Sequence, residues 1–254
     1  MSVIEWVIDI ALGAVLGFLG GLFGIGGGVL AIPTLGVFFG FSQQMAQGTA
    51  MVTVVPNVYL ALWLYRKRHD IPLRLALAVG FASIIFTYLA ARVAIGMDSH
   101  LLRRCFAAFV FCVATYMVWK AWVLAPPAVP RPAVVSRKWL PSLGAITGIV
   151  GGLFGVGGGI LTPPLMTGLF GMKQLEAQGW TLALVAPGAT AALLTYGHAG
   201  EVHWRTGVLL AVGGFAAISP GVALAHKLPE RLLRGAFGVF LWFAAAGLFL
   251  TSLR

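Results

Sequence analysis

Long apolar stretches separated by short polar or basic clusters run through the whole chain of 254 residues. Most of these stretches approach the roughly 20 residues that a helix needs to cross the hydrocarbon core of a bilayer. The pattern predicts an all-α protein with helical segments at residues 3–23, 29–40, 46–65, 75–95, 105–124, 139–154, 160–171, 177–197, 206–225 and 235–253. Apolar residues make up 59% of the chain and charged residues only 9%. A soluble domain could not cover its surface with so few charges, so we predict a polytopic membrane protein.

One glycine-rich stretch occurs twice. Residues 20–35 read GGLFGIGGGVLAIPTL and residues 151–166 read GGLFGVGGGILTPPLM, with ten of the sixteen paired positions identical. Each copy has three adjacent glycines at its centre, and each glycine in a helix costs about 1 kcal/mol relative to alanine. We therefore expect a broken helix in each copy, with the second half-helix starting at Val29 or Ile160.

The repetition extends beyond the glycines. A constant offset of 131 residues aligns Ala46-Gln47-Gly48 with Ala177-Gln178-Gly179, and Pro56 with Pro187. Similar hydrophobicity alone does not place glutamine and proline in register, so the sequence indicates an internal duplication. We expect a first membrane repeat at residues 1–124, a proline-rich cytoplasmic connector at 125–138 and a second repeat at 139–254. Each repeat would hold a glycine-broken helix and three transmembrane helices.

Basic residues predict the orientation of the two repeats. If each glycine break turns the chain back, each repeat has five membrane segments and the second repeat is inverted. The 17 lysines and arginines then divide 12 to 5 between the two sides, against 10 to 7 for two parallel repeats. The basic side of a membrane protein is cytoplasmic. We therefore expect an inverted repeat with both termini on the periplasmic side.

Inverted repeats with broken helices are typical of secondary transporters, whose substrate lies at the repeat interface. A half-helix that begins at a break presents unpaired N–H groups and the positive end of the helix dipole, which together suit an anion. Gln47 and Gln178 add amide donors. The substrate-binding residues that we predict are Gly26, Gly27, Gly28, Val29, Gln47, Thr49, Gly157, Gly158, Gly159, Ile160, Gln178 and Thr181. Helix kinks are expected at Pro33, Pro56, Pro164 and Pro187.

Structural roles for these residues stay open. The glycines could serve only close helix packing, and the glutamines could hydrogen-bond a neighbouring helix. Cys105 and Cys112 are expected to be buried small apolar residues, neither a disulfide nor a metal site. His198, Glu201 and His203 fall in a short loop, and we interpret them as part of a solvated turn.

Several functional classes are disfavoured. The basic residues cluster between apolar stretches, as in cytoplasmic loops, so nucleic-acid binding is not expected. The chain lacks HExxH, GxSxG and paired-aspartate motifs, so we expect neither an enzyme nor a metal or other cofactor. Glu5 and Asp9 are the carboxylates within the expected spans, and both lie near the start of the first one. We therefore expect electrogenic anion export without an obligatory proton, which the membrane potential favours by about 2.3 kcal/mol per charge per 100 mV.

The paired motif GxFGxGGGxLxxPx(L/M), at residues 21–35 and 152–166, and the Ala-Gln-Gly after each copy resemble the TauE/SafE family of bacterial sulfite exporters. The second copy departs from the first at Pro163, where the first has Ile32. The resemblance implies export of a small sulfur oxyanion, sulfite or an organosulfonate, across the cytoplasmic (inner) membrane. The partners would be that anion and the lipid bilayer, and a homodimer is compatible with the sequence. An anion channel, or a permease for another small anion, is the alternative.

Overall fold

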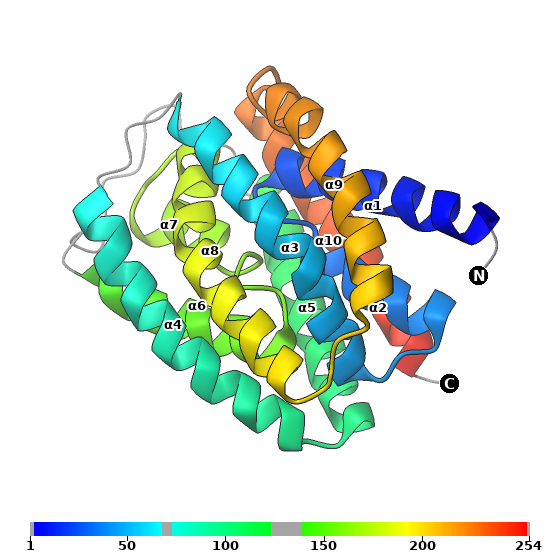
Figure 1. Ribbon diagram of the computed structural model, residues 1–254. Helices are drawn as coiled ribbons and strands as arrows, with labels where there is room; N and C mark the ends of the chain where they lie inside the picture. Colours follow the sequence, from blue (N-terminus) through cyan, green and yellow to red (C-terminus); the bar gives the residue numbers. More distant parts are fainter. Residues whose placement is uncertain (1–2, 68–72, 123–138, 253–254) are drawn as a thin grey trace.

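The computed structural model describes residues 3–67, 73–122 and 139–252, and these residues form ten α-helices (Figure 1). The first half contains α1 (Val3–Phe23), α2 (Gly28–Phe39), α3 (Gln43–Arg66), α4 (Leu73–Gly96) and α5 (Ser99–Trp122). The second half contains α6 (Leu140–Phe154), α7 (Thr162–Leu169), α8 (Gln174–His198), α9 (Trp204–Ala225) and α10 (Glu230–Ser252). The all-helical prediction is confirmed, whereas the connector expected at 125–138 lies outside the described residues.

Both glycine-rich segments break the helix where the sequence predicts. Left-handed φ angles of 67°, 73° and 89° occur at Gly24, Gly26 and Gly27, and angles of 65°, 61° and 76° occur at Gly155, Gly157 and Gly158. Glycine adopts this conformation readily, whereas a residue with a Cβ is strained in it. The chain therefore leaves each first helix and changes direction before the second one starts.

The second half-helix begins later than the sequence predicts. Ile160 lies in a turn after the glycines, and α7 starts at Thr162 with 8 residues, against 12 in α2. The N–H groups of Leu161 and Thr162 both reach the carbonyl of Gly158, which keeps this stretch in a tight turn. The prolines at 163 and 164 favour a helix that starts here, because the first turn does not need their missing N–H groups.

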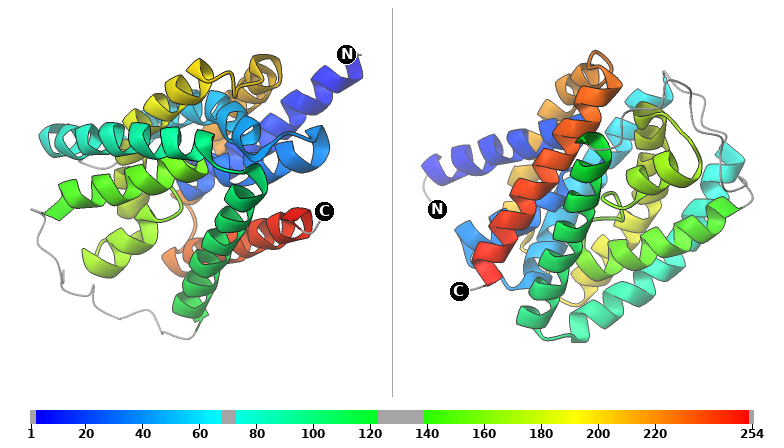
Figure 2. Two further views of the ribbon diagram at one scale, coloured as in Figure 1. Left: turned by 90° about the horizontal axis from the view of Figure 1, so that it is seen from below. Right: turned by 180° about the vertical axis from the view of Figure 1, so that it is seen from behind.

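The helices of the two halves are interleaved. α1 packs mainly against α9 of the other half, and α6 packs mainly against α4. α3 and α8 contact each other in the middle of the molecule, and α5 lies beside α10 (Figures 1 and 2). The 131-residue offset converts α1 into α6, α3 into α8, α4 into α9 and α5 into α10. Each contact therefore maps onto another contact or onto itself, as a two-fold relation between similar halves would produce.

The two central helices run in opposite directions. Near the end of α3, Tyr65 is hydrogen-bonded to Gln178 near the start of α8. Near the start of α3, Gln47 is hydrogen-bonded to Tyr196 near the end of α8. α3 and α8 are therefore antiparallel, although the offset makes them equivalent. Between these two contacts, Tyr59 lies 3.3 Å from the hydroxyl of its own counterpart under the offset, Thr190.

The peripheral helix pairs pack through glycines spaced four residues apart. Gly13, Gly17 and Gly21 of α1 lie against Leu210, Gly214 and Ile218 of α9. Gly144, Gly148 and Gly152 of α6 lie against Val79, Ser83 and Thr87 of α4. A Cβ at any of these six glycines would overlap the backbone of the partner helix, so the close approach requires them. The residue numbers rise together in both pairs, which makes α1 parallel to α9 and α6 parallel to α4.

The described helices have the length and the surface of a membrane protein. Five are long and apolar enough to cross a bilayer, namely Ile4–Phe23, Gln43–Arg66, Val79–Gly96, Gln174–His198 and Trp204–Ala225. Large apolar side chains cover the outer surface, such as Phe81, 66% exposed, and Phe243, 70% exposed. Lipid solvates such side chains, whereas water would not favour so many of them together. The chain is therefore a multi-pass membrane protein.

The two cysteines correct one expectation. Cys105 and Cys112 are exposed on α5, so the prediction that they are buried is wrong. α5 packs against α10 and leaves its other side outward (Figure 2). Lipid tails are as apolar as a protein interior. An apolar sequence therefore does not tell which side of a membrane helix a small residue occupies.

Candidate functional site

The two glycine breaks meet in the middle of the molecule. A Cβ built at Gly28 would lie 3.5 Å from the carbonyl oxygen of Gly155 in the other break. A Cβ built at Gly159 would lie 3.3 Å from the backbone of Ile25 in the first break. The structure thus brings the predicted glycines of both copies to one place.

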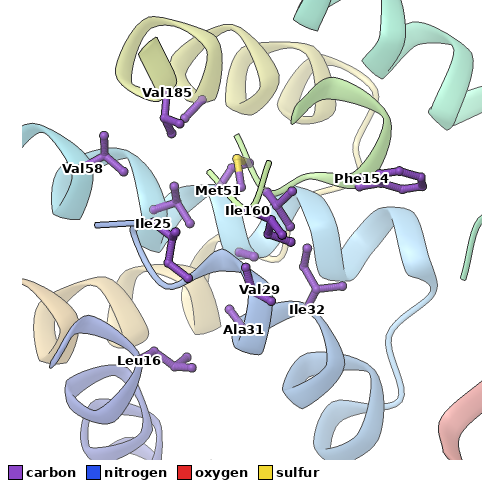
Figure 3. Packing of buried hydrophobic residues seen from close by; sticks show 14 of the residues in the cluster. Leu16, Ile25, Val29, Ala31, Ile32, Met51, Val58, Phe154, Ile160 and Val185 are labelled. Atoms are coloured by element: carbon purple, nitrogen blue, oxygen red, sulfur yellow. The ribbon is translucent and has the colours of Figure 1, made fainter. Parts of the chain in front are cut away.

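Apolar side chains fill the space around this contact. Ile25, Val29, Met51 and Ile160 belong to one cluster and are fully buried (Figure 3). Val29 and Ile160, the predicted first residues of the two half-helices, both take part in it. The two breaks are therefore held together by packed hydrophobic side chains from both halves.

The start of α2 carries backbone donors that no side chain caps. Its N-cap is Gly27, with a φ of 89°, and no side-chain hydrogen bond caps the helix there. The N–H of Ala31 is the first to reach back, 3.2 Å from the carbonyl of Gly27. The N–H groups before Ala31 are those that a helix leaves without an intrahelical partner, at the positive end of its dipole. Because Gly28 and Val29 are buried, these donors suit a desolvated anion.

The start of α7 is different. Pro163 and Pro164 occupy its first turn and have no N–H groups. The N–H of Thr162 donates to the carbonyl of Gly158 at 3.3 Å, and the Thr162 hydroxyl donates to the same oxygen at 2.9 Å. The N–H of Gly159 also has a partner, the carbonyl of Val156. α7 therefore presents fewer free donors than α2, and the two helix starts are not chemically equivalent.

The predicted glutamines lie against the breaks and bind tyrosines. The Tyr65 hydroxyl donates to Oε1 of Gln178 at 2.8 Å, and the Tyr196 hydroxyl donates to Oε1 of Gln47 at 2.7 Å. All four side chains are fully buried. Each glutamine also packs against one break, because a Cβ at Gly24 or at Gly155 would overlap Gln178 or Gln47. We call these two pairs the tyrosine–glutamine ties.

Each tie also reaches the last turn of the helix that precedes a break. The carbonyl of Gly21 in α1 lies 3.4 Å from the Tyr65 hydroxyl, and the carbonyl of Gly152 in α6 lies 3.0 Å from the Tyr196 hydroxyl. The last carbonyls of a helix have no intrahelical donor. The ties therefore join α3, α8 and the end of α1 or α6, which is the helix-to-helix bonding that the sequence left open for the glutamines.

The two glutamines differ in one respect. Nε2 of Gln178 lies 3.4 Å from the carbonyl of Leu22. Nε2 of Gln47 is buried without a hydrogen-bond partner among the described residues. A buried amide donor without a partner is costly. Gln47 is therefore the glutamine with donor capacity to spare.

Sequence reasoning missed the tyrosines. The signal was present, because the 131-residue offset pairs Tyr65 with Tyr196, as it pairs Gln47 with Gln178. A buried tyrosine needs a partner for its hydroxyl. Two polar residues repeated in register on the same two helices were a sufficient reason to expect a contact between them.

The predicted threonines and prolines have structural roles in the helices. The Thr49 hydroxyl accepts the N–H of His203 at 2.9 Å, and the Thr181 hydroxyl donates to the carbonyl of Ala177 in its own helix at 2.7 Å. Three of the predicted kink residues lie inside helices, Pro33 in α2, Pro56 in α3 and Pro187 in α8. Pro164 lies in the first turn of α7 instead, a position that does not interrupt a helix.

Asn57 and Asp9 are among the other buried polar side chains. Asn57 in α3 is fully buried, and neither its Oδ1 nor its Nδ2 has a partner among the described residues. Asp9 in α1 is 2% exposed, and its Oδ2 is also without a hydrogen-bond partner there. In the loop region, His198 ends α8 and His203 caps α9. Within the described residues, no three His, Cys, Asp or Glu side chains come together as a metal site.

Comparison with known proteins agrees with this architecture. A family model described as sulfite exporter TauE/SafE matches residues 9–248. The chain is 28% identical over 243 residues to a probable membrane transporter protein of Xylella fastidiosa strain Temecula1, covering 94% of the chain and 93% of that relative. It is 22% identical over 252 residues to the probable membrane transporter protein YunE of Bacillus subtilis, covering 90% and 92%. It is 30% identical over 165 residues to the probable membrane transporter protein MJ0441 of Methanocaldococcus jannaschii, covering 62% of the chain and 60% of that relative.

Proposed function

The chain belongs to the sulfite exporter TauE/SafE family of membrane transporters, and from this premise we propose that it exports a small sulfur oxyanion, sulfite or an organosulfonate. One observation carries the anion-binding part of the proposal. The buried start of α2, whose backbone donors have no capping side chain, lies where the two glycine breaks meet. We place the anion against the N–H groups of Gly28, Val29 and Leu30. Backbone dipoles hold an anion without a full positive charge, which permits release on the other side.

We propose that the two halves form an inverted repeat. The antiparallel run of α3 and α8 supports this, because repeats in the same orientation would make these equivalent helices parallel. α5 and α10, which the offset also makes equivalent, run in opposite directions as well (Figure 2). In inverted-repeat transporters the substrate site lies at the repeat interface, and here that interface contains both glycine breaks.

The charges support an orientation for this inverted repeat. Arg66 and Lys67 at the end of α3, Lys173 before α8 and Lys227 after α9 all fall on one side of the arrangement. The basic side is cytoplasmic. We therefore assign the start of α1 and the end of α10 to the periplasmic side of a bacterial inner membrane.

A carrier fits the centre better than an open channel does. Ile25, Val29 and Ile160 are fully buried where the two breaks meet. An anion can reach the donors of α2 only after these side chains move apart. Movement of the halves about a fixed site is the way inverted-repeat transporters expose a substrate to each side in turn.

The binding proposal is tested by Val29→Pro, which removes one donor from the first turn of α2. Proline is tolerated in the first turn of a helix, as Pro163, the second residue of α7, illustrates. Proteoliposomes that contain the protein should release sulfite, and proteoliposomes without it should not. The affinity for sulfite, measured by thermal shift, should fall roughly 10- to 100-fold in Val29→Pro. Val29→Ala keeps the N–H and serves as the matched control. Equal affinities in the two variants would place the anion elsewhere.

Orientation and coupling are tested separately. A reporter fused after Arg254 should be periplasmic, and one inserted between residues 125 and 138 should be cytoplasmic. Both reporters on one side would exclude the inverted repeat.

In proteoliposomes at equal pH, sulfite efflux should accelerate as the interior becomes more negative. Efflux that ignores voltage and follows a pH gradient would contradict electrogenic export.

A further inference from the structure

The two tyrosine–glutamine ties have the geometry of barriers on opposite sides of the glycine breaks. We propose that they are the two gates of the transport route, Tyr65–Gln178 closing it on the cytoplasmic side and Tyr196–Gln47 closing it on the periplasmic side. The assignment of the tyrosines as gate residues rests on the proposed transport function and on the inverted repeat, but not on the identity of the anion.

The ties lie at opposite ends of the central helix pair. Tyr65 follows Gln47 by 18 residues, a separation of about 27 Å along α3 at 1.5 Å per residue. Between them, Val54 and Val58 contact Gly26 of the first break. In α8, Val185 and Ala189 lie between Gln178 and Tyr196 and contact Gly157 of the second break. Along the α3–α8 pair both breaks therefore lie between the two ties, so a route that follows this pair passes one tie on its way to the breaks from either side.

Each tie also joins three helices that have to separate. The Tyr65 tie holds α3 and α8 together and reaches the last turn of α1, through Gly21. The Tyr196 tie holds the same two helices together at their other end and reaches the last turn of α6, through Gly152. Breaking one tie therefore loosens one end of the α3–α8 contact and leaves the other end closed.

The chemistry of the ties suits repeated opening. All the groups involved are neutral, so no ion has to be separated from a counter-ion when a tie opens. The acceptors are buried, so an opened tie favours closing again once the solute has passed. The tyrosine ring adds an apolar body to the hydroxyl contact, which keeps the closed position dry. Both ties are formed together here, which corresponds to a route closed on both sides.

Arg66 and Lys67 determine which gate faces the cytoplasm. They follow Tyr65 directly and belong to the basic side of the molecule. Tyr196 is followed by His198 and by the loop that carries Glu201, on the opposite side of the α3–α8 pair. Opening the Tyr65 tie should therefore expose the centre to the cytoplasm, and opening the Tyr196 tie should expose it to the periplasm.

The proposal is tested with a reporter cysteine at the centre. Met51 is fully buried and its Cε lies 3.7 Å from a Cβ built at Gly28, so Met51→Cys reports on access to the breaks. Cys105 and Cys112 are first replaced by serine. A membrane-impermeant, positively charged methanethiosulfonate reagent is then added to spheroplasts or to inverted vesicles. In Tyr65→Phe the labelling rate should rise about tenfold in inverted vesicles only, the effect of one lost hydrogen bond on an opening equilibrium.

The other variants complete the test. Tyr196→Phe should raise labelling in spheroplasts only, Gln178→Met should behave like Tyr65→Phe, and Gln47→Met should behave like Tyr196→Phe. Tyr59→Phe is the matched control, because Tyr59 also hydrogen-bonds across α3 and α8 but is half exposed. It should leave labelling unchanged.

Two results would overturn the gates. One is a reporter that stays unreactive in both tyrosine variants while they remain monodisperse in detergent, which would reduce the ties to support for the ends of α1 and α6. The other is labelling that rises from the same side in both variants. The assay contains no sulfite, so the gates can fail while the anion site stands, and the Val29→Pro result can fail while the gates stand.

Discussion

The two glycine breaks share a sequence and a set of backbone angles, but they lead into different helices. The first continues into a helix of 12 residues with uncapped backbone donors, and the second continues through a turn into a helix of 8 residues that starts with prolines. The left-handed glycines are common to both, because they set the change of chain direction. The donors differ, because they depend on the residues that follow. The two breaks therefore share the turn, whereas the uncapped N–H groups on which the proposed anion site depends belong mainly to the first break.

A second pair of equivalent places shows the same inequality. Asn57 of α3 faces Gly214 of α9, and the offset converts this pair into Gly188 of α8 facing Ser83 of α4. One polar side chain and one glycine occupy each place, and both polar residues belong to the first half, Asn57 on the central helix α3 and Ser83 on the peripheral helix α4. The backbone arrangement is shared, whereas the polar groups that line it are not.

The largest effect is expected where the breaks are alike. Gly27→Ala and Gly158→Ala each place a Cβ on a left-handed residue, and at Gly27 that Cβ would lie 2.6 Å from the carbonyl oxygen of Leu16. Each should lower the free energy of unfolding by about 2–4 kcal/mol, measured by thermal unfolding in detergent. Gly40→Ala measures the cost of the left-handed backbone alone, because Gly40 has a φ of 67° and a Cβ added there would have no neighbour within 4 Å. Tolerance of one substitution but not the other would show that the breaks are not structurally equivalent.

The next effect should separate the breaks. Pro163→Val restores one N–H to the first turn of α7, and Val29→Pro removes one from α2. Removing a donor to a charged ligand should weaken sulfite binding by about 1.5–3 kcal/mol, whereas the change in α7 should alter affinity less than twofold. Isothermal titration calorimetry of the two variants in detergent gives the ratio of their affinities for sulfite. Clearly tighter sulfite binding in Pro163→Val would mean that the start of α7 also holds the anion.

A smaller difference is expected between the glutamines. Gln178→Met removes the bond from Tyr65 and a contact with Leu22, whereas Gln47→Met removes the bond from Tyr196 together with an unpartnered donor. Removing that buried, unpartnered donor offsets part of the stability lost with the hydrogen bond. Gln47→Met should therefore cost about 1 kcal/mol less stability than Gln178→Met, as read from paired thermal melts. A larger cost at position 47 would mean that its Nε2 has a ligand in the purified protein.

The smallest effect is expected at Asn57. Asn57→Leu replaces a buried amide without partners by an apolar group of similar size, so stability should stay within about 1 kcal/mol of the parent or increase. Ser83→Ala at the equivalent place should change it by less than about 0.5 kcal/mol. Transport by the Asn57 variant is the informative readout. Loss of efflux at unchanged stability would show that the Asn57 amide takes part in transport, and the second half has no equivalent polar group.

The sequence was sufficient for the helices and the breaks, because apolar length and adjacent glycines act locally. The offset of 131 also identified Gln47 and Gln178 as a pair, and the structure places both against the breaks. The late start of α7 was not predictable in the same way, since it depends on how Leu161 and Thr162 share one carbonyl. The outward side of Cys105 could not be predicted either, because lipid and protein interior favour the same residues.

The interleaving of the halves has a consequence for biogenesis. The glycine face of α1 fits α9, whose contacting residues begin near Leu210, so α1 must wait in the membrane until nearly 200 further residues have been made. At 5–20 residues per second that wait is roughly 10–40 s. During it the Gly13–Gly17–Gly21 face is unpaired in lipid, and an early release or a pause in synthesis would leave the first half without its main neighbour.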